Sequence, residues 1–442
     1  MTDIVAPPAT LPDRSFPELL RSYRERAGLT QGALADLSTI SPRAIRDLES
    51  GRANARTRTI QLLADGLRLQ GLMRELFIHA GLCGRRPAPA GAEAGPAVPQ
   101  PVNAMLGRDT EVRTMVEVLE TGRRRMISIS GLPGVGKTRL AAEVAARLAA
   151  RRGWPVLWLG AQPRTGDEAG ALGPLARSLR LLLGSGAADV SRVAQVIGRH
   201  EVLLVLDGVA DVRAPAGVAE LLAYCPQLRV ISTSRAPWHV PGVQAAVISP
   251  LATPGRDWAA AASVDALGGV PSVRLLLDRL AEVRPGLALG AADVGAAAEL
   301  CRRLDGLPLA LEVVAGRFRV LSLRQLLEVP VRALLDLPVP PRSGAPAQTI
   351  GGLIGSTVAS LGDGHRTVLR ELAGLPRSWT AAGAAAVLGR PPDDMVDVLS
   401  VLIGSGLVRV SPGDPATDLH VPNLLRAFLL PRRCATTSDN LW

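Results

Sequence analysis

The segment GLPGVGKT, residues 131–138, constrains the fold of this chain more than any other feature. It fits the pattern G-x-x-x-x-G-K-[ST], in which backbone amides cradle phosphates, the lysine reaches the β- and γ-phosphates, and the hydroxyl binds Mg²⁺. The apolar run MISIS precedes it and the helical stretch TRLAAEVAARLAARR follows it, as this motif requires. The pattern predicts a nucleotide-binding α/β domain. Its candidate nucleotide contacts are Gly131, Pro133, Gly134, Val135, Gly136, Lys137, Thr138 and Arg139.

Lys137 is the single lysine of the chain, since the other 49 of its 50 basic residues are arginines. Aromatic residues make up only 3% of the chain, and Ala, Gly, Leu and Arg dominate, which is typical of codon bias in a GC-rich genome. Composition therefore explains the arginines, but it does not explain a retained lysine. A planar guanidinium replaces a compact ammonium group poorly at a phosphate loop. The lone lysine thus favours a working nucleotide site over a simple glycine-rich turn.

Two more apolar runs end in polar residues that suit a phosphate site. The run EVLLVLDG would deliver Asp207 to the cation, directly or through water. An acidic residue there could instead only begin a turn, but Lys137 upstream favours the cation role. The segment STSR places Thr233 and Arg235 where a sensor of the γ-phosphate would lie, although Arg235 alone would more often be a surface arginine. The catalytic candidates are Lys137 and Asp207, and the candidate Mg²⁺ ligands are Thr138 and Asp207.

The 442-residue length suggests about three domains, and two proline-rich stretches divide the chain. The first, residues 84–103, is typical of an extended linker, and the second, residues 337–348, should separate two packed helical regions. Between them, the runs PVLWLG, EVLLVLDG and LRVISTS alternate with helical stretches, which indicates buried parallel strands with crossover helices. Residues 255–335 read as helical, and 350–430 as helical with a late strand pair.

The amino-terminal region reads as several short amphipathic helices with a basic surplus. Residues 13–86 carry 13 arginines against eight acidic residues, which suits phosphate polyanions but also an ordinary soluble surface. Gly28 can end one helix, Thr30 can cap the next, and Ser41 can cap a third that starts at Pro42. On that third helix the apolar face holds Ala44, Ile45 and Leu48, and the polar face holds Arg43, Arg46, Asp47 and Ser50.

This polar face suits a DNA major groove, where arginine reads guanine or binds phosphate, but it could also be a plain solvated face. The stretch LLRSYRERAGLTQGALADLSTISPRAIRDLESG, within Leu19 to Leu69, resembles the Cro-like phage-repressor helix-turn-helix family, with its GLTQ and LESG landmarks. The resemblance implies that Gln31 and Ser41 contact backbone phosphates and that Arg43 and Arg46 approach bases. The candidate DNA contacts are therefore Thr30, Gln31, Ser41, Arg43 and Arg46; a domain retained for protein contacts is the alternative.

From about Leu106 to Phe428 the chain resembles the NB-ARC type of STAND ATPase, found in bacterial transcriptional regulators and immune receptors. The resemblance rests on LGRDTEV, GLPGVGKT, VLLVLDG, STSR and especially CRRLDGLPLALEVVAGR (301–317). It implies that Leu106 and Arg108 lie against adenine and that Pro308 packs on the base. The expected domains are a helix-turn-helix domain (13–83), the linker (84–103), a P-loop NTPase domain (104–253), a helical domain (254–336) and a winged-helix domain (350–430).

The chain departs from that family in three places. Gly208 follows Asp207 where hydrolytic relatives commonly have an acid, which leaves Asp211 as a weak candidate for the general base. The Met-His-Asp-like motif, whose histidine locks ADP in relatives, aligns with Val421, Pro422 and Asn423, and the adjacent His420 should face the other way. We therefore doubt a tight ADP lock. The chain also ends at Trp442, so we expect no sensor repeats.

These observations lead to the expectation of an ATP-binding switch that uses ATP, ADP and Mg²⁺, binds operator or promoter DNA, and self-associates on ATP binding. The alternatives are a defence or signalling receptor whose small domain contacts protein, and an enzyme whose turnover is itself the function, against which Gly208 argues.

We expect a cytoplasmic protein without membrane contact, because no apolar run reaches the roughly 18–20 residues that span a bilayer. The four cysteines are too far apart to indicate a disulfide framework or a zinc site: Cys83, Cys225, Cys301 and Cys434.

Overall fold

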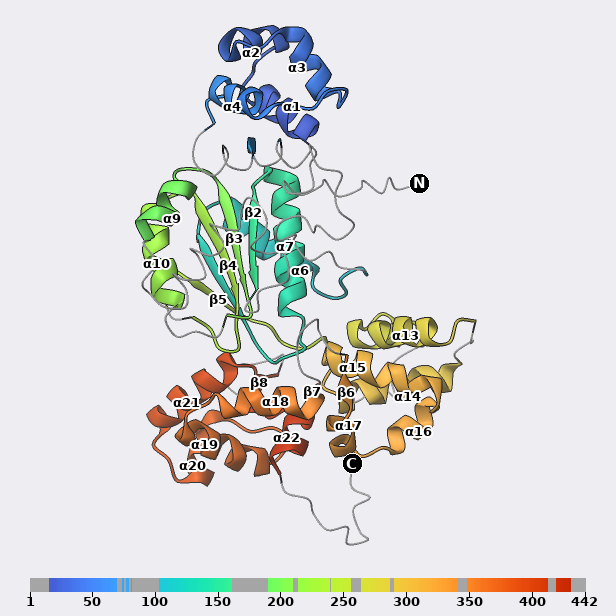
Figure 1. The fold of residues 1–442 in the computed structure, drawn as a ribbon. Coiled ribbons are helices and arrows are strands. Elements are labelled where there is room, and N and C mark those ends of the chain that lie inside the picture. The colour runs from blue at the N-terminus through green and yellow to red at the C-terminus, as the bar shows by residue number, and fades with distance from the viewer. Residues whose placement is uncertain are drawn as a thin grey trace.

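The computed structural model describes three groups of elements: an amino-terminal helical bundle, a sheet covered by helices, and a mostly helical remainder (Figure 1). The candidate Asp211, Cys83, Cys434 and all of the predicted linker except Asn103 lie outside the described residues. The described residues are 16–69, 74, 77–78, 81, 103–160, 190–209, 214–238, 240–255, 264–286, 290–340, 348–411 and 419–430.

The amino-terminal bundle forms as its capping residues predict. Thr30 Oγ1 accepts a hydrogen bond from the Ala33 N–H (3.1 Å), and Ser41 Oγ accepts one from the Ala44 N–H (3.2 Å). Gly28, just beyond the first helix, has a φ of +66°, a conformation that glycine adopts without strain. The helices are α1 (Phe16–Arg26), α2 (Gln31–Ser38), α3 (Pro42–Glu49) and α4 (Thr57–Gly66), and their core includes Leu20, Leu34, Ile45, Ile60 and Phe77.

A five-stranded, all-parallel sheet forms the middle of the chain, in the strand order β2-β3-β4-β1-β5. The four strands predicted from apolar runs are present. The fifth, β5, lies at the edge of the sheet and alternates between half-buried and exposed residues, so it has no continuous apolar run to predict it. The strands are β1 (Met126–Ser130), β2 (Val156–Gly160), β3 (Val202–Asp207), β4 (Leu228–Thr233) and β5 (Gln244–Val247).

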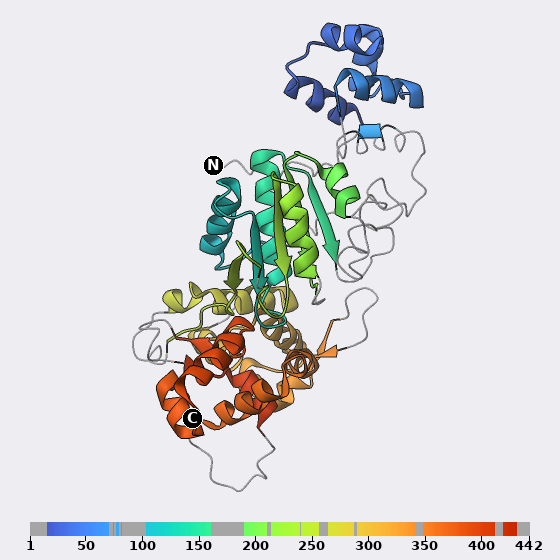
Figure 2. The same cartoon turned by 90° about the vertical axis from the view of Figure 1, so that its left-hand side faces the viewer.

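Helices cover both faces of this sheet, giving three layers (Figure 2). Alternation along β3 sorts its side chains: Leu203 and Val205 pack in the core under α6 and α7, whereas Leu204 and Leu206 pack in the core under α9 and α10. Strands buried on both sides read as continuous apolar runs, which is why the sequence predicts them. These helices are α6 (Asp109–Glu120), α7 (Lys137–Arg152), α9 (Val190–Ile197) and α10 (Ala214–Tyr224).

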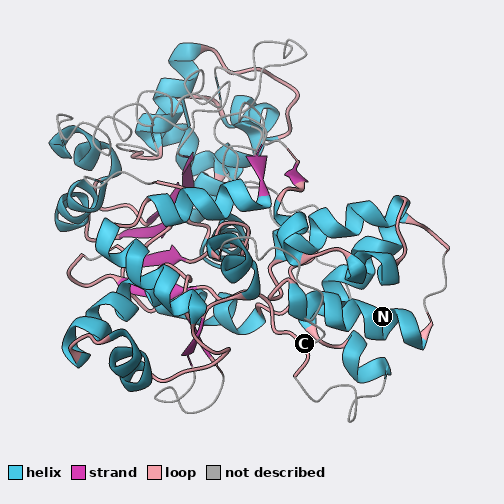
Figure 3. Ribbon diagram, turned by 90° about the horizontal axis from the view of Figure 1, so that it is seen from below, coloured by secondary structure: helices cyan, strands magenta, loops and turns pink. Residues whose placement is uncertain are grey.

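The remainder comprises a helical region (residues 264–340) and a C-terminal region (residues 348–430), which share one hydrophobic core with the α6 and α7 side of the sheet. Seen from below, helices make up most of the molecule around the strands (Figure 3). The predicted late strand pair is present as antiparallel β8 and β9, and a second short antiparallel pair, β6 and β7, joins the two ends of the second proline-rich stretch. The helical region contains α12 (Val264–Gly268), α13 (Pro271–Val283), α14 (Ala291–Arg303), α15 (Pro308–Ala315), the 3₁₀ turn η2 (Gly316–Arg319), α16 (Leu323–Glu328), α17 (Val331–Leu335) and β6 (Pro338–Val339). The C-terminal region contains β7 (Gln348–Thr349), α18 (Ile350–Ala359), α19 (Asp363–Gly374), α20 (Ala381–Leu388), α21 (Pro392–Gly404), β8 (Arg409–Val410), β9 (Leu419–His420) and α22 (Asn423–Leu429).

The expected fold class is confirmed: a helical domain at the amino terminus, an α/β domain with a parallel sheet, and a further helical part. Within the residues that the structure describes, no helix is long and apolar enough to cross a membrane.

Candidate functional site: a phosphate loop, a cation corner and a helix-turn-helix surface

The phosphate loop, residues 131–136, connects the carboxyl end of β1 to the start of α7. Gly131, Gly134 and Gly136 have φ values of +139°, +80° and +103°. Residues with a side chain rarely adopt these conformations, which explains why the loop needs three glycines. The turn brings the amino terminus of a 16-residue helix to the loop, and unpaired N–H groups at such a terminus favour an anion.

Lys137 begins α7, and its side chain folds back over the loop. Its Nζ donates to the carbonyl oxygens of Gly131 (2.7 Å) and Leu132 (3.0 Å). The ammonium group therefore lies against the loop itself, within hydrogen-bond distance of its first two residues. Arg139, also a predicted nucleotide contact, donates here to the carbonyls of Asn103 and Ala104, so it holds the start of the α/β domain to α7.

A cluster of three oxygen-bearing side chains forms at the carboxyl ends of the strands. Asp207 and Thr233 are aligned partners on β3 and β4, and Thr233 Oγ1 donates to Asp207 Oδ1 at 2.7 Å. Thr138 Oγ1, from the first turn of α7, donates to the same carboxylate oxygen at 2.8 Å. The structure thus brings together the two predicted Mg²⁺ ligands and adds Thr233 to them.

This cluster, which we call the cation corner (Thr138, Asp207 and Thr233), fits Mg²⁺. Magnesium prefers oxygen ligands, and in nucleotide sites one or two carboxylates suffice because phosphates and water complete the shell. Such a site needs no large acidic cluster, and the described residues contain no group of three or more His, Cys, Asp or Glu side chains placed to hold a metal. Bound there, Mg²⁺ would neutralise charge on the phosphate oxygens.

The three residues expected near the adenine base lie in different surroundings. Leu106 is half-buried, and Arg108 is buried with its guanidinium on Glu111 (3.0 Å) and on the carbonyl of Ser249. Pro308 begins α15, and the N–H of the next residue, Leu309, donates to the Gly134 carbonyl at 3.2 Å. The GLPL segment therefore touches the phosphate loop directly.

Arg235 does not turn toward the cation corner. It is exposed, and its Nη1 donates to the carbonyl of Ser356 on α18 at 3.1 Å. A long arginine side chain can reach several partners from one backbone position. The location of Arg235 at the end of a strand therefore does not determine which group its guanidinium contacts. In this arrangement Arg235 links the α/β domain to the C-terminal region.

The C-terminal region rests on the phosphate loop, which the sequence analysis did not foresee. Ser130 Oγ, at the end of β1, donates to the Gly404 carbonyl at 2.8 Å in a buried position. Gly406 has a φ of +73°, and a Cβ there would lie 3.0 Å from the Leu132 nitrogen. The run GSG at 404–406 could signal a helix end, but nothing local in the sequence indicates that it approaches the phosphate loop.

A buried carboxylate joins the helical and C-terminal regions. Asp305, just after α14, has a left-handed φ of +54°. Its Oδ1 accepts from the Asn423 N–H (3.0 Å) and its Oδ2 from the Leu424 N–H (2.9 Å), at the start of α22. Burial raises the pKa of Asp305 to about 6, although these two N–H groups oppose the shift. The Arg409 guanidinium also donates to the Asp305 carbonyl, at 3.3 Å.

The positions aligned with the Met-His-Asp-like motif lie at this junction. Val421 is buried, Pro422 precedes α22, and Asn423 begins it, with its side-chain amide donating to the Arg302 carbonyl at 3.1 Å. The adjacent His420 lies on β9 with Nδ1 3.3 Å from Ser411 Oγ. The start of α22 is therefore held by Asp305.

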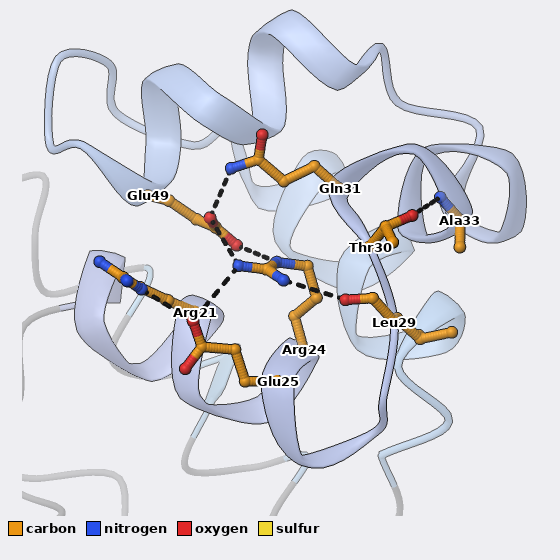
Figure 4. Close-up of polar contacts among 8 residues, drawn as sticks. All are labelled: Arg21, Arg24, Glu25, Leu29, Thr30, Gln31, Ala33 and Glu49. Carbon is orange, nitrogen blue, oxygen red and sulfur yellow. Dashed lines mark hydrogen bonds and ion pairs between the residues drawn. The ribbon is translucent and has the colours of Figure 1, made fainter.

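In the amino-terminal bundle, a glutamate at the end of α3 organises the surface expected to meet DNA (Figure 4). Glu49 accepts from Gln31 Nε2 (2.7 Å) and, through both oxygens, from Arg24 (2.6 and 3.1 Å). Arg24 also donates to the Leu29 carbonyl at 2.9 Å, and the hydrogen bond to Glu49 raises the pKa of Arg24. Gln31, a predicted phosphate contact, is thereby fixed in position at the first turn of α2.

The other predicted DNA contacts lie around α3. Arg43 and Arg46 are exposed, on the side opposite to the buried Ile45 and Leu48, as the sequence predicts. Thr30 and Ser41 are exposed and use their hydroxyl oxygens to cap α2 and α3. A hydroxyl that accepts a capping bond can still donate its hydrogen to a phosphate oxygen.

We expect Glu49→Gln to loosen the amino-terminal bundle by about 2 kcal/mol, because it leaves the nearly buried Arg24 guanidinium without its charged acceptor. Glu25→Gln is the matched control, since Glu25 contacts Arg21 and Arg24 but its side chain is 53% exposed and such pairs contribute little. Native-state hydrogen exchange of residues 16–69 in the full chain measures both. Equal effects of the two substitutions would contradict this assignment.

The comparisons with known proteins agree with the amino-terminal assignment. A family model described as a helix-turn-helix domain matches residues 16–77, so this part of the chain is a helix-turn-helix domain. The resemblance to helix-turn-helix regulators is thereby confirmed. The rest of the chain contributes a P-loop NTPase type of α/β domain, as its strand order and phosphate loop define.

Two Mycobacterium tuberculosis proteins are among the similar curated sequences. One, "Putative HTH-type transcriptional regulator Rv0890c", is 27% identical over 324 residues, which is 70% of this chain and 34% of that protein. The other, "Uncharacterized protein Rv0894", is 26% identical over 289 residues, or 65% of this chain and 69% of that protein. The chain thus spans about a third of the length of the regulator that it matches.

Among solved structures, the chain is similar to a STAND protein with a tetratricopeptide repeat sensor from Pyrococcus horikoshii. The sequence identity is 14% and the TM-score 0.31, over 76% of this chain and 44% of that one. At this level of likeness, the fold assignment depends on the strand order and phosphate loop of the chain itself.

Proposed function

We propose that this protein is a cytoplasmic transcription regulator whose DNA binding depends on a nucleotide bound at the phosphate loop. The observation that carries the proposal is the site built by Lys137, Thr138 and Asp207, in a chain that also bears a helix-turn-helix domain. The ligands would be ATP or ADP with Mg²⁺, and the DNA an operator or promoter. The domain boundaries expected from the sequence (13–83, 104–253, 254–336 and 350–430) are part of this proposal.

Each element of the site has a part in nucleotide binding. The glycines of the phosphate loop let its amides approach the phosphates, Lys137 would move from the loop carbonyls to the β- and γ-phosphate oxygens, and Asp207 with Thr138 would hold Mg²⁺. Gly208 follows Asp207 and supplies no side chain that could activate water. We therefore propose slow hydrolysis that resets the switch.

Nucleotide can change DNA binding only if it binds two arrangements of the protein with different affinity. The contacts of Gly404 and Gly406 with the loop supply a reason for such a difference, because phosphates entering the loop would meet the C-terminal region there. Self-association in the ATP state would then place two helix-turn-helix domains on paired half-sites.

A binding assay on the DNA upstream of this protein's own gene, run without nucleotide, with ATP and with ADP, tests the proposal. We expect specific binding whose affinity differs at least several-fold between the ATP and ADP states. Oligomeric state is measured in the same samples by light scattering. Identical DNA affinity and identical mass in all three states would refute the switch.

A further inference from the structure

We propose that Asp305 is a positioning residue that holds the C-terminal region closed over the phosphate loop and so controls how fast nucleotide enters and leaves. This inference rests on the proposed nucleotide binding, but the contacts that support it belong to the chain alone. They form a closed circuit of three regions. The phosphate loop contacts the GLPL segment (residues 306–309), and Asp305, directly before that segment, contacts α22. Gly404 and Gly406, which belong to the same C-terminal region as α22, contact the phosphate loop.

Asp305 is close in the sequence to the residue that contacts the phosphate loop. Three residues separate it from Leu309, whose N–H donates to the Gly134 carbonyl at 3.2 Å. Between them, the Gly306 carbonyl accepts from the Leu251 N–H at 3.0 Å, and a Cβ at Gly306 would lie 2.2 Å from the Leu251 oxygen. This segment is therefore packed closely against Leu251, and at Leu309 against the phosphate loop, where a Cβ at Gly134 would lie 2.5 Å from the Leu309 Cβ.

The bond between Asp305 and α22 joins regions that are far apart in the sequence. Three other helices of these regions are capped locally, by Ser322, Thr349 and Thr380, whereas α15, α19 and α21 have no side-chain cap. Helix α22 follows Pro422 and has no such side-chain cap. Its first two N–H groups are satisfied by a carboxylate more than a hundred residues earlier, so this cap forms only when the two regions are together.

Burial of the charged Asp305 carboxylate opposes the closed arrangement. The Asp305 carboxylate is buried, and the charged groups that face it are the guanidinium groups of Arg409 and Arg377. Burial costs the ionised carboxylate free energy that the two N–H bonds only partly offset, and burial also lowers the pKa of Arg409. Closure is therefore held by directional bonds whose contribution is reduced by the burial of the charge.

The test uses the full chain with Asp305→Gly, which removes the carboxylate and tolerates the left-handed φ. Asp305→Asn keeps an acceptor oxygen and also tolerates this conformation. The control is Asp293→Ala, because the Asp293 carboxylate accepts a backbone N–H only three residues away (3.0 Å). Two quantities are measured: dissociation of a fluorescent ADP analogue by stopped flow, and hydrogen exchange of residues 131–136, 404–411 and 419–430.

We expect Asp305→Gly to accelerate ADP release about tenfold or more, since two buried N–H groups lose their acceptor, and to raise exchange in all three segments. Asp305→Asn keeps one acceptor oxygen but turns its amide NH2 toward the other backbone N–H, so it should give a rate between those of wild type and Asp305→Gly. Asp293→Ala should match wild type. Wild-type release kinetics in Asp305→Gly, or increased exchange confined to 419–430, would overturn the inference. If the wild type binds no ADP analogue, the proposed function fails, and the exchange of 131–136 and 404–411 still decides the role of Asp305.

A pH profile covers the case in which Asp305→Gly does not fold. The pKa of Asp305 is about 6 when closed and near 4 when exposed to water, so the closed arrangement binds a proton more tightly. Lowering the pH from 7 to 5 should therefore slow ADP release in the wild type relative to Asp305→Asn. Parallel profiles for the two proteins would overturn the inference.

Discussion

Lys137→Ala is expected to lower ATP affinity by roughly a thousandfold while leaving the fold intact. The substitution removes the ammonium group that would contact the β- and γ-phosphates, and charge-assisted hydrogen bonds contribute about 1.5–3 kcal/mol each. The contacts of Lys137 include two carbonyls of its own loop, and Lys137 is not among the buried residues of the core, so its loss should not disturb the core. Isothermal titration with ATP and Mg²⁺ measures the change.

Two further variants sharpen this experiment. Lys137→Arg keeps the charge and follows the arginine bias of the chain, but we expect it to lose at least tenfold in affinity because a planar guanidinium fits the loop poorly. Arg151→Ala, at the far end of α7 with a side chain 60% exposed, should bind ATP as the wild type does. ATP binding by Lys137→Ala within threefold of wild type would show that the nucleotide is not held at this loop.

Replacing Arg43 and Arg46 together by alanine is expected to weaken specific DNA binding by a hundredfold to a thousandfold. Both side chains are exposed on α3 while Ile45 and Leu48 hold that helix to the bundle, so the substitution should not affect stability. An arginine that reads a base contributes about 1–3 kcal/mol, and one that binds phosphate weakens binding uniformly across sequences. Fluorescence anisotropy with specific and scrambled duplexes separates the two roles.

The charge-matched control for that experiment is Arg21→Ala combined with Arg26→Ala on α1, which also removes two exposed arginines from the bundle. We expect it to reduce affinity only slightly, and the salt dependence of binding to fall more in the α3 variant. If both double variants lose affinity equally, the basic surface acts only by charge. If neither loses any, these arginines do not bind the DNA, which favours the alternative of a domain that contacts protein.

Local sequence patterns predicted much of this structure. The phosphate loop, the four buried strands and the caps at Thr30 and Ser41 all follow from patterns within a few residues, where glycine conformation, periodicity and hydrogen bonding decide the outcome. The shared oxygen cluster was also predictable in part, because Asp207 and Thr138 belong to motifs whose spacing implies that they meet. The sequence analysis did not predict the edge strand β5, because two of its four residues are exposed and it has no continuous apolar run.

The contacts that escaped prediction join segments far apart in the chain. Ser130 with Gly404, and Asp305 with α22, depend on how whole regions pack, and no local pattern specifies such packing. Arg139 and Arg235 show the same limit for side chains: each lies where its motif places it, yet its guanidinium binds carbonyls of another segment. Long, flexible side chains take the partner that tertiary structure offers them.

The position of Lys137 at the phosphate loop also makes the proposed nucleotide site open to selective chemical modification. Since the chain has one lysine, its only ε-amino group lies at the site proposed for nucleotide. A lysine-specific protease can therefore cut this chain at one peptide bond, after Lys137, and an amine-directed reagent can modify one side chain. Protection of that single position by ATP or ADP in the purified protein would report directly whether the site is occupied.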